Sequence, residues 1–175
     1  MKTLIYFFSG LIVFLLFSCG PNNFPKSGTV EQTKENYKFP ESKGAVNDLE
    51  NILSENEELQ LNGLIDSFRN NIKSDVLLLT TDTIYYFDDI KNYMHVASKQ
   101  WGRGHAINPY GITIAVSKKL YQARISTGDS IFAVIPDSLI GNILDEKMVP
   151  DFKKNYFFSG IKAGLRELGN ELKKD

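Results

Sequence analysis

A chain of 175 residues, 42% of them hydrophobic, is long enough to bury one substantial core and too short for two comfortable domains. Twenty Lys and Arg residues against 21 Asp and Glu give a formal net charge of −1, so no general attraction to nucleic acid is expected. One cysteine and two histidines exclude an intramolecular disulfide framework and a CxxC redox or zinc site, and they leave few options for imidazole chemistry.

Residues 1–18 have the layout of a secretory signal peptide. Lys2 supplies a positive charge, and the apolar stretch from Leu4 to Phe17 is shorter than the ~20 residues that a membrane-spanning helix needs. The stretch ends in small or turn-forming residues, Ser18, Cys19 and Gly20. A membrane anchor that stays attached at the N-terminus is the alternative interpretation.

The segment LFSC, residues 16–19, resembles the bacterial lipobox, in which an aliphatic, a variable and a small residue precede a cysteine. The resemblance implies that Cys19 becomes the mature N-terminus, with a diacylglyceryl thioether and an amide-linked acyl chain. Several buried acyl chains, at ~0.8 kcal/mol per CH₂, are enough for stable anchoring. The expected location is therefore the bacterial cell envelope, on its periplasmic or outer-surface side, with the mature chain tethered to a membrane by lipid.

Residues 19–43 are predicted to be a flexible tether ahead of a folded domain that covers residues 44–175. Pro21, Pro25 and Pro40 lie among Asn, Ser, Thr, Lys and Glu, without a sustained apolar period. No function beyond reach is expected there.

The folded part opens with a well-marked helix and a strand. Ser54 and Glu57 have the spacing of a capping box. Apolar residues at helical spacing then predict an amphipathic helix over 55–73. The short apolar run DVLLLTTD predicts a buried central strand over 75–82.

A second helix is predicted to begin at Asp88 and Asp89, where negative charge suits the helix dipole. Its buried face is expected to contain Ile90, Tyr93, Met94, Ala97 and Trp101. Gly102 follows at the position where a left-handed C-cap is usual.

The rest of the chain predicts a hairpin and two helices. Strands over 111–116 and 121–127 are close enough to form an antiparallel hairpin. A short helix is expected after Pro136 and is expected to end at Pro150, and a final amphipathic helix is expected over 155–172. The order of elements predicts an α/β domain with a mixed sheet and helices on its faces.

The glycine-rich segment QWGRGHAINPYGITIAV, residues 100–116, does not fit a nucleotide-binding loop. Such loops follow a strand and open a helix, whose N-terminus supplies amides and positive dipole to the phosphates. Here Gly102 and Gly104 follow a helix and precede a strand, and Ile107 stands where a third glycine is required. No nucleotide ligand is expected.

An ordered set of segments resembles the TPM domain family. The segments are AVNDLENILSENE, WGRG, GITIAVSKKLYQARISTG, IPDSLIGNIL and VPDFKKNYFFSGIKAGL, and they extend from about residue 45 to residue 170. The resemblance implies an α/β/α sandwich with a small mixed sheet. The family includes a thylakoid-lumen protein with acid phosphatase activity that is linked to photosystem II repair. It also includes bacterial envelope proteins of unclear role, and members that bind calcium or other divalent ions in an acidic cleft.

The resemblance also assigns candidate site residues. Asp48 matches the acidic position ahead of the first helix, and Asp137 matches the acid of the family's L-P-D motif, so both are candidate ligands for Ca²⁺ or another divalent ion. Arg124 lies in the family's R-x-x-x-G strand and is a candidate phosphate-binding residue. Phe132 and Asn155 stand where the family often has acids, so any metal site is expected to be weak.

Each of these residues also has a structural interpretation. Asp137 can be a helix N-cap, Asp48 a surface turn residue and Arg124 the partner of a carboxylate. His105 lies in a polar loop and is expected to be solvated, while His95 is expected at the boundary of the buried helix face.

Two classes of function follow. The first is a non-catalytic accessory or binding module that helps to assemble or maintain a membrane protein complex of the envelope. The alternative is a metal-dependent acid phosphatase that uses water activated by a carboxylate-bound ion. The absence of GxSxG, HExxH and EF-hand patterns leaves serine-nucleophile, zinc-protease and helix-loop-helix calcium chemistry without support. The fewer acidic residues favour the binding module.

Overall fold

A computed structural model describes residues 36–174 of the chain. The predicted signal peptide, the predicted lipidation site Cys19 and most of the predicted tether lie outside the described residues. The described part contains one four-stranded sheet, built from β1 (Val46–Asp48), β2 (Asp75–Thr80), β3 (Gly111–Ser117) and β4 (Gln122–Thr127). The strand order is β1-β2-β3-β4, with the first three strands parallel and β4 antiparallel to β3.

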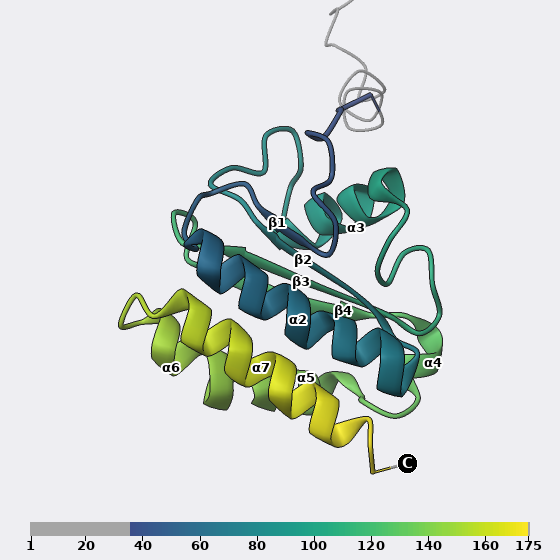
Figure 1. The fold of residues 1–175 in the computed structure, drawn as a ribbon. Coiled ribbons are helices and arrows are strands. Elements are labelled where there is room, and N and C mark those ends of the chain that lie inside the picture. Colours follow the sequence, from purple (N-terminus) through teal and green to yellow (C-terminus); the bar gives the residue numbers. More distant parts are fainter. Residues whose placement is uncertain (1–35, 175) are drawn as a thin grey trace, which may run out of the picture.

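Helices cover both faces of this sheet (Figure 1). The long helices α2 (Glu55–Ile72) and α7 (Phe157–Glu171) lie side by side on one face, and α3 (Ile90–Trp101) covers the other. The short helices α4 (Asp129–Phe132), α5 (Asp137–Asn142) and α6 (Val149–Phe152) belong to the α2 side. The predicted α/β/α sandwich with a small mixed sheet is thereby confirmed. Within residues 36–174, no helix combines the length and apolar character needed to cross a membrane.

The central strand β2 is buried on both sides. Val76 and Leu78 pack with α2 and α7, whereas Leu77 and Leu79 pack with α3, and all four side chains are fully buried. Because both faces of the strand contact helices, its sequence is a continuous apolar run and not an alternating one. The sequence therefore identified this strand correctly, although it ends at Thr80 and not at residue 82.

The two helical crossovers differ in hand. The connections through α2 and α3 both step in the same direction across parallel strands, but the two helices lie on opposite faces of the sheet. Two such crossovers must have opposite hands, so one of them is the rare left-handed kind. This arrangement gives each face of β2 its own helix.

The local helix signals are confirmed where the sequence placed them. The backbone N–H of Ser54 donates to the Glu57 carboxylate at 2.8 Å, and the Ser54 hydroxyl accepts from the Glu57 N–H at 3.4 Å, which completes the capping box. Asp89 caps α3 by accepting from the Asn92 N–H at 2.7 Å. Gly102 ends α3 in the left-handed conformation, with φ of 64°.

Helix α5 begins at Asp137, as predicted, but its expected side-chain cap and its expected end are wrong. The cap residue of α5 is Pro136, in an extended conformation, so the helix begins at Asp137 and this side chain makes no capping bond. Pro150 does not end the helix either, because α5 continues through a π-helical segment, η1 (Ile143–Met148), into α6. Pro150 lies in the first turn of α6, directly after the π-helical segment, and the helical run continues through it.

The folded region also extends further toward the N-terminus than predicted. Strand β1, which the sequence analysis did not identify, pairs with β2. Before it, Tyr37 and Phe39 pack against the α3-side core, and Pro40 accepts a hydrogen bond from the Trp101 indole N–H at 2.9 Å. The last part of the predicted tether thus contacts the domain.

Candidate functional site

Asp48, the first candidate metal ligand, completes the turn between β1 and α2. Its side chain is 3% exposed, so it is not the surface turn residue of the alternative interpretation. One carboxylate oxygen accepts from the Ile52 N–H at 3.2 Å and from the Thr80 hydroxyl, and the other accepts from the Leu53 N–H at 2.8 Å. Both oxygens therefore already bind donors of the fold.

Asp137, the second candidate ligand, lies far from Asp48. Asp48 is at the carboxyl end of β1, opposite Thr80, whereas α5 begins beyond α4, which follows the other end of the sheet (Figure 1). The Asp137 side chain is exposed. Across residues 36–174, no group of three or more His, Cys, Asp and Glu side chains could hold a metal ion. The fold does not bring the two carboxylates together.

Arg124, the candidate phosphate-binding residue, is also separate from both. It lies on β4 opposite Ala115, on the face that α3 covers, and it is exposed. No carboxylate of residues 36–174 pairs with it, so the interpretation of Arg124 as an ion-pair partner has no support in this part of the chain.

At the carboxyl end of the parallel strands, a groove lies between the β3–β4 hairpin and the chain around α6. Its volume is about 430 Å³, within the usual range for small-ligand sites. The lining residues are Val116, Ser117, Lys118, Tyr121, Gln122, Ala123, Val149, Phe152, Lys153, Asn155 and Phe157. Open α/β sheets commonly bind ligands beyond the carboxyl ends of their strands. We call this hollow the hairpin groove.

The hairpin that forms one wall of the groove is held by a carboxylate from another element. Glu50, just after β1, accepts from the backbone N–H groups of Lys118 and Lys119 at 2.9 and 2.8 Å. Ser117 accepts from the Leu120 N–H at 3.1 Å, which tightens the same turn. These bonds fix the backbone of the turn that carries Lys118.

The groove combines apolar and cationic surface. Phe152 and Phe157 stack with ring centroids 5.3 Å apart, and the Lys118 ammonium lies 5.8 Å from the Phe157 ring. Lys153 is exposed at the rim, and Tyr121 is 95% exposed beside it. Such a surface can hold an apolar group that carries a negative charge next to it.

Asn155, which replaces an acid of the family pattern, lines this groove with φ of 61°. Asparagine tolerates the left-handed conformation better than most residues, so the turn into α7 is compatible with the neutral side chain. In the sequence, Asn155 departs from the family pattern, whereas Lys118, Lys153 and the two phenylalanines show no signal of a site. The groove joins segments about 30 residues apart, and a pattern within one segment does not show it.

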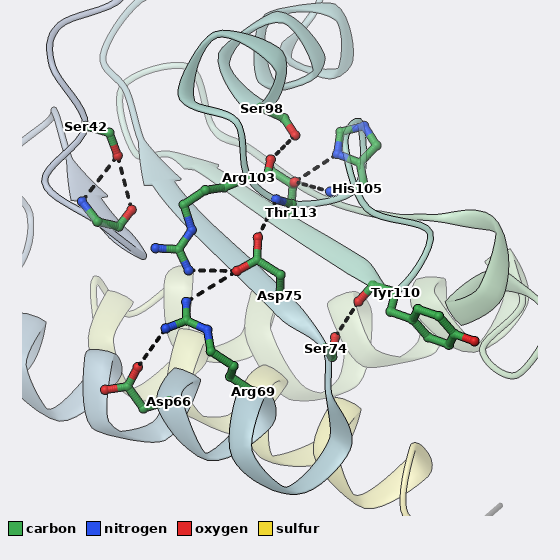
Figure 2. Close-up of polar contacts among 12 residues, drawn as sticks. Ser42, Asp66, Arg69, Ser74, Asp75, Ser98, Arg103, His105, Tyr110 and Thr113 are labelled. Carbon is green, nitrogen blue, oxygen red and sulfur yellow. Dashed lines mark hydrogen bonds and ion pairs between the residues drawn. The ribbon is translucent and has the colours of Figure 1, made fainter.

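A second hollow lies at the other end of the sheet, around Asp75 (Figure 2). Asp75 accepts from the Arg103 guanidinium at 2.8 Å, from the Gly104 N–H at 2.8 Å and from the Arg69 guanidinium at 3.4 Å. Burial by itself raises the pKa of the Asp75 carboxyl, but the bonds from Gly104 and the two arginines outweigh it and hold the pKa below its ordinary value.

His105, expected to be solvated, is instead partly buried behind this cluster. Its Nδ1 is 2.8 Å from the Thr113 hydroxyl, and its Nε2 is 3.3 Å from Nδ1 of His95. Burial, with a smaller contribution from the nearby His95, lowers the pKa of His105 to about 4. His95 lies at the boundary of the helix face, as expected, and its pKa is also lowered, first by burial and then by Lys99.

Solved structures with the same fold are known. The NMR structure of the N-terminal domain of a protein from P. gingivalis matches with a TM-score of 0.66 and 22% identity, covering 74% of this chain and 82% of that one. The N-terminal domain of a Corynebacterium glutamicum protein matches with a TM-score of 0.57 and 14% identity, covering 78% and 87%. No match was found among curated proteins. The model of the TPM domain matches residues 46–171, which is most of the chain, and the protein therefore belongs to the TPM domain family.

Proposed function

We propose that this protein is a lipid-anchored binding module of the bacterial cell envelope, and that the hairpin groove receives an extended segment of a partner protein. The observation that carries the proposal is the groove itself, with stacked Phe152 and Phe157 inside and Lys118 and Lys153 at its rim. The partner segment ends in an apolar side chain, which enters the groove, and in a free carboxylate, which the lysines attract.

The position of the groove supports an extended partner. Strand β4 is at the edge of the sheet, and its first residues, Gln122 and Ala123, line the groove. An edge strand can pair with an added strand through its backbone N–H and C=O groups. A segment added along β4 would bring its terminal residue to the groove.

The expected setting is an envelope protein complex, reached by the lipid on Cys19. In this proposal the lipid holds the domain near the membrane, and the groove selects the partner. The carboxylates that a metal-dependent phosphatase needs are engaged or separated, since Asp48 binds three donors of its own fold and Asp137 lies beyond the other end of the sheet. A binding role makes no such demand.

The test uses a fluorescent hexapeptide that ends in Leu-Phe with a free carboxylate, titrated with the purified protein in fluorescence anisotropy. We expect saturable binding, and binding at least about fivefold weaker for the same peptide with an amidated C-terminus, because the charge-assisted bonds are lost. Lys118→Ala and Lys153→Ala should each weaken binding of the free acid. Lys99→Ala, on α3 and outside the groove, is the matched control.

Equal affinity for the acid and the amide would contradict the role of the lysines. Binding that survives in the Lys118→Ala, Lys153→Ala double variant would place the peptide elsewhere and remove the groove from the proposal.

A further inference from the structure

The hollow around Asp75 has an excess of positive charge that the ion pairs of the fold do not use. It is lined by Arg69, Lys73, Ser74, Asp75, Gly102, Arg103, Ile107, Asn108 and Pro109, and its volume is about 670 Å³. Three of these side chains are cationic and one is anionic. Figure 2 shows both guanidinium groups converging on the carboxylate of Asp75, between the end of α2 and the loop after α3.

Arg103 lines the hollow and has one donor without an acceptor in the described part of the chain. Its Nη2 donates to Asp75 at 2.8 Å, but its Nε is buried and has no hydrogen-bond acceptor among the described residues. It is the one buried side-chain nitrogen or oxygen atom of residues 36–174 without a partner. A buried donor left unsatisfied costs about 1–3 kcal/mol, so native structures usually supply an acceptor from protein, water or a bound ion.

Lys73 and Arg69 also line the hollow. Lys73 follows α2 in the left-handed conformation, with φ of 56°, and its side chain is exposed and pairs with no carboxylate of the described chain. Arg69 is 3.4 Å from Asp75 and 3.8 Å from Asp66, both longer than a strong charge-assisted bond. Since Arg103 and Gly104 already occupy the Asp75 oxygens at 2.8 Å, Arg69 and Lys73 retain donors for another anion.

From these contacts we infer that this hollow is a binding site for a small tetrahedral oxyanion, a phosphate or sulfate group. Arg69, Lys73 and Arg103 reach the hollow from three segments, and an anion with several oxygens can accept from all of them at once. A planar carboxylate has fewer acceptor directions and matches this set less well. The site is independent of the hairpin groove, because the two lie at opposite ends of the sheet and share no residue.

The experiment measures the thermal unfolding of the purified full chain with sodium phosphate, sodium sulfate, sodium acetate or sodium chloride at matched ionic strength. We expect a saturable rise in Tm with phosphate and sulfate, about 3–6 °C at tenfold the dissociation constant. Acetate should have a clearly smaller effect, and chloride should account for screening alone.

Two variants locate the site. Lys73→Asn removes the charge but keeps a residue that tolerates the left-handed conformation, and Arg69→Ala removes a guanidinium that is half exposed. Each should weaken phosphate binding at least about fivefold in an NMR titration. Lys99→Gln removes one charge outside the hollow and should leave the binding unchanged.

Three results would overturn the inference: a Tm rise that chloride reproduces, acetate binding as tight as phosphate binding, or phosphate binding that Lys73→Asn and Arg69→Ala both retain. Because the peptide titration reads the hairpin groove, a failure here is distinguishable from a failure of the proposed function.

Discussion

Asp48 and Asp137 carry the same chemical group and do different work. The Asp48 carboxylate is buried and accepts three hydrogen bonds, whereas Asp137 is exposed in the first turn of a helix and makes no capping bond. The position that the family resemblance suggested as a metal ligand is therefore hydrogen-bonded within the fold at Asp48. The difference lies in whether the oxygens are free, which burial and partners decide.

We expect Asp48→Ala to lower the free energy of unfolding by about 2–4 kcal/mol, because two backbone N–H groups and the Thr80 hydroxyl lose their acceptor. Asp137→Ala is the matched control and should change it by no more than about 0.5 kcal/mol. Urea unfolding measures both. Equal effects of the two substitutions would contradict the structural role of Asp48.

The same geometry predicts that low micromolar Ca²⁺ leaves the Tm unchanged, since a calcium site wants six to eight oxygens and these two carboxylates lie apart. Hydrolysis of a generic phosphate ester should be negligible as well. Differential scanning fluorimetry and a colorimetric phosphatase assay test both points. A Ca²⁺-dependent rise in Tm that Asp48→Asn and Asp137→Asn each abolish would restore the metal site.

His105 should make the fold sensitive to mild acid. Its pKa is about 4 in the folded protein, below the ordinary value of 6.5, so between these two pH values the unfolded chain binds more protons than the folded one. The contribution of His105 to the free energy of unfolding is therefore fully present above pH 6.5 and is lost as the pH falls toward 4. The loss is about 1–2 kcal/mol once partial exposure of the ring is allowed for.

Urea unfolding at pH 7.5 and pH 4.5 measures this loss. His105→Asn places an amide where Nδ1 contacts the Thr113 hydroxyl and does not titrate, so its stability should depend less on pH across this range. Asp75 does not contribute to this difference. Its pKa lies below its ordinary value, so the stability that it provides is lost only in stronger acid. A variant with undiminished pH dependence would show that another group is responsible.

At the scale of elements, the segment before β1 behaves as a part of the domain. Phe39 contacts Tyr93, Trp101 and Phe87, with ring centroids 4.8, 5.5 and 6.1 Å apart. The Phe39 N–H donates to the Gln100 side chain at 3.1 Å. Trp101 was predicted to face the core but is only partly buried. Its indole N–H donates to the Pro40 carbonyl, so the segment before β1 covers part of the ring.

Phe39→Ala should therefore destabilise the protein by about 2–3 kcal/mol, less than a fully enclosed core phenylalanine, because the ring is only partly buried. Lys38→Ala, one residue away and exposed, should have an effect within about 0.5 kcal/mol. Chemical denaturation followed by Trp101 fluorescence would report both, because Trp101 lies beside Phe39. Equal stabilities of the Phe39→Ala and Lys38→Ala variants would mean that the segment is only a tether, as the sequence indicated.

At the scale of the whole molecule, the two hollows lie at opposite ends of one sheet. The hairpin groove lies beyond the carboxyl ends of the parallel strands, and the hollow around Asp75 lies beside their amino ends. A module with this layout can bind two ligands without direct competition between them.

The predicted lipid anchor has to be tested on the whole chain. We expect Cys19→Ala to release the protein from the membrane fraction or to leave it as an unprocessed precursor, because both the acyl chains and the cleavage site depend on that thiol. Fractionation and gel mobility of the expressed protein measure this outcome. Parent-like fractionation and mobility would show that the lipobox interpretation is wrong and would favour a retained N-terminal anchor.

Local sequence signals determined the helices and the central strand. These signals act between neighbours in the chain, so a single segment is enough to recognise them. They are the Ser54–Glu57 capping box, the Gly102 C-cap and the apolar run of β2. The short strand β1 could not be predicted, because three residues are too few to show an alternation of apolar and polar side chains. Helix α5 begins at Asp137, as predicted, but the helical run does not end at Pro150, which lies in the first turn of α6.

The sites were decided by tertiary structure. The family pattern drew attention to Asp48, Asp137 and Arg124, yet the sheet separates them, because strand order and crossover direction place each on a different edge or face. Lys118 and Phe157 line the same groove, and Lys73 and Arg103 line the same hollow. Each pair is 30 residues or more apart in the sequence, so no local pattern connects its members. The sequence by itself determined which elements form and to which family they belong. Only the packing of those elements decided which charges are paired, which are free and which share a hollow, because charge pairing depends on distances in space.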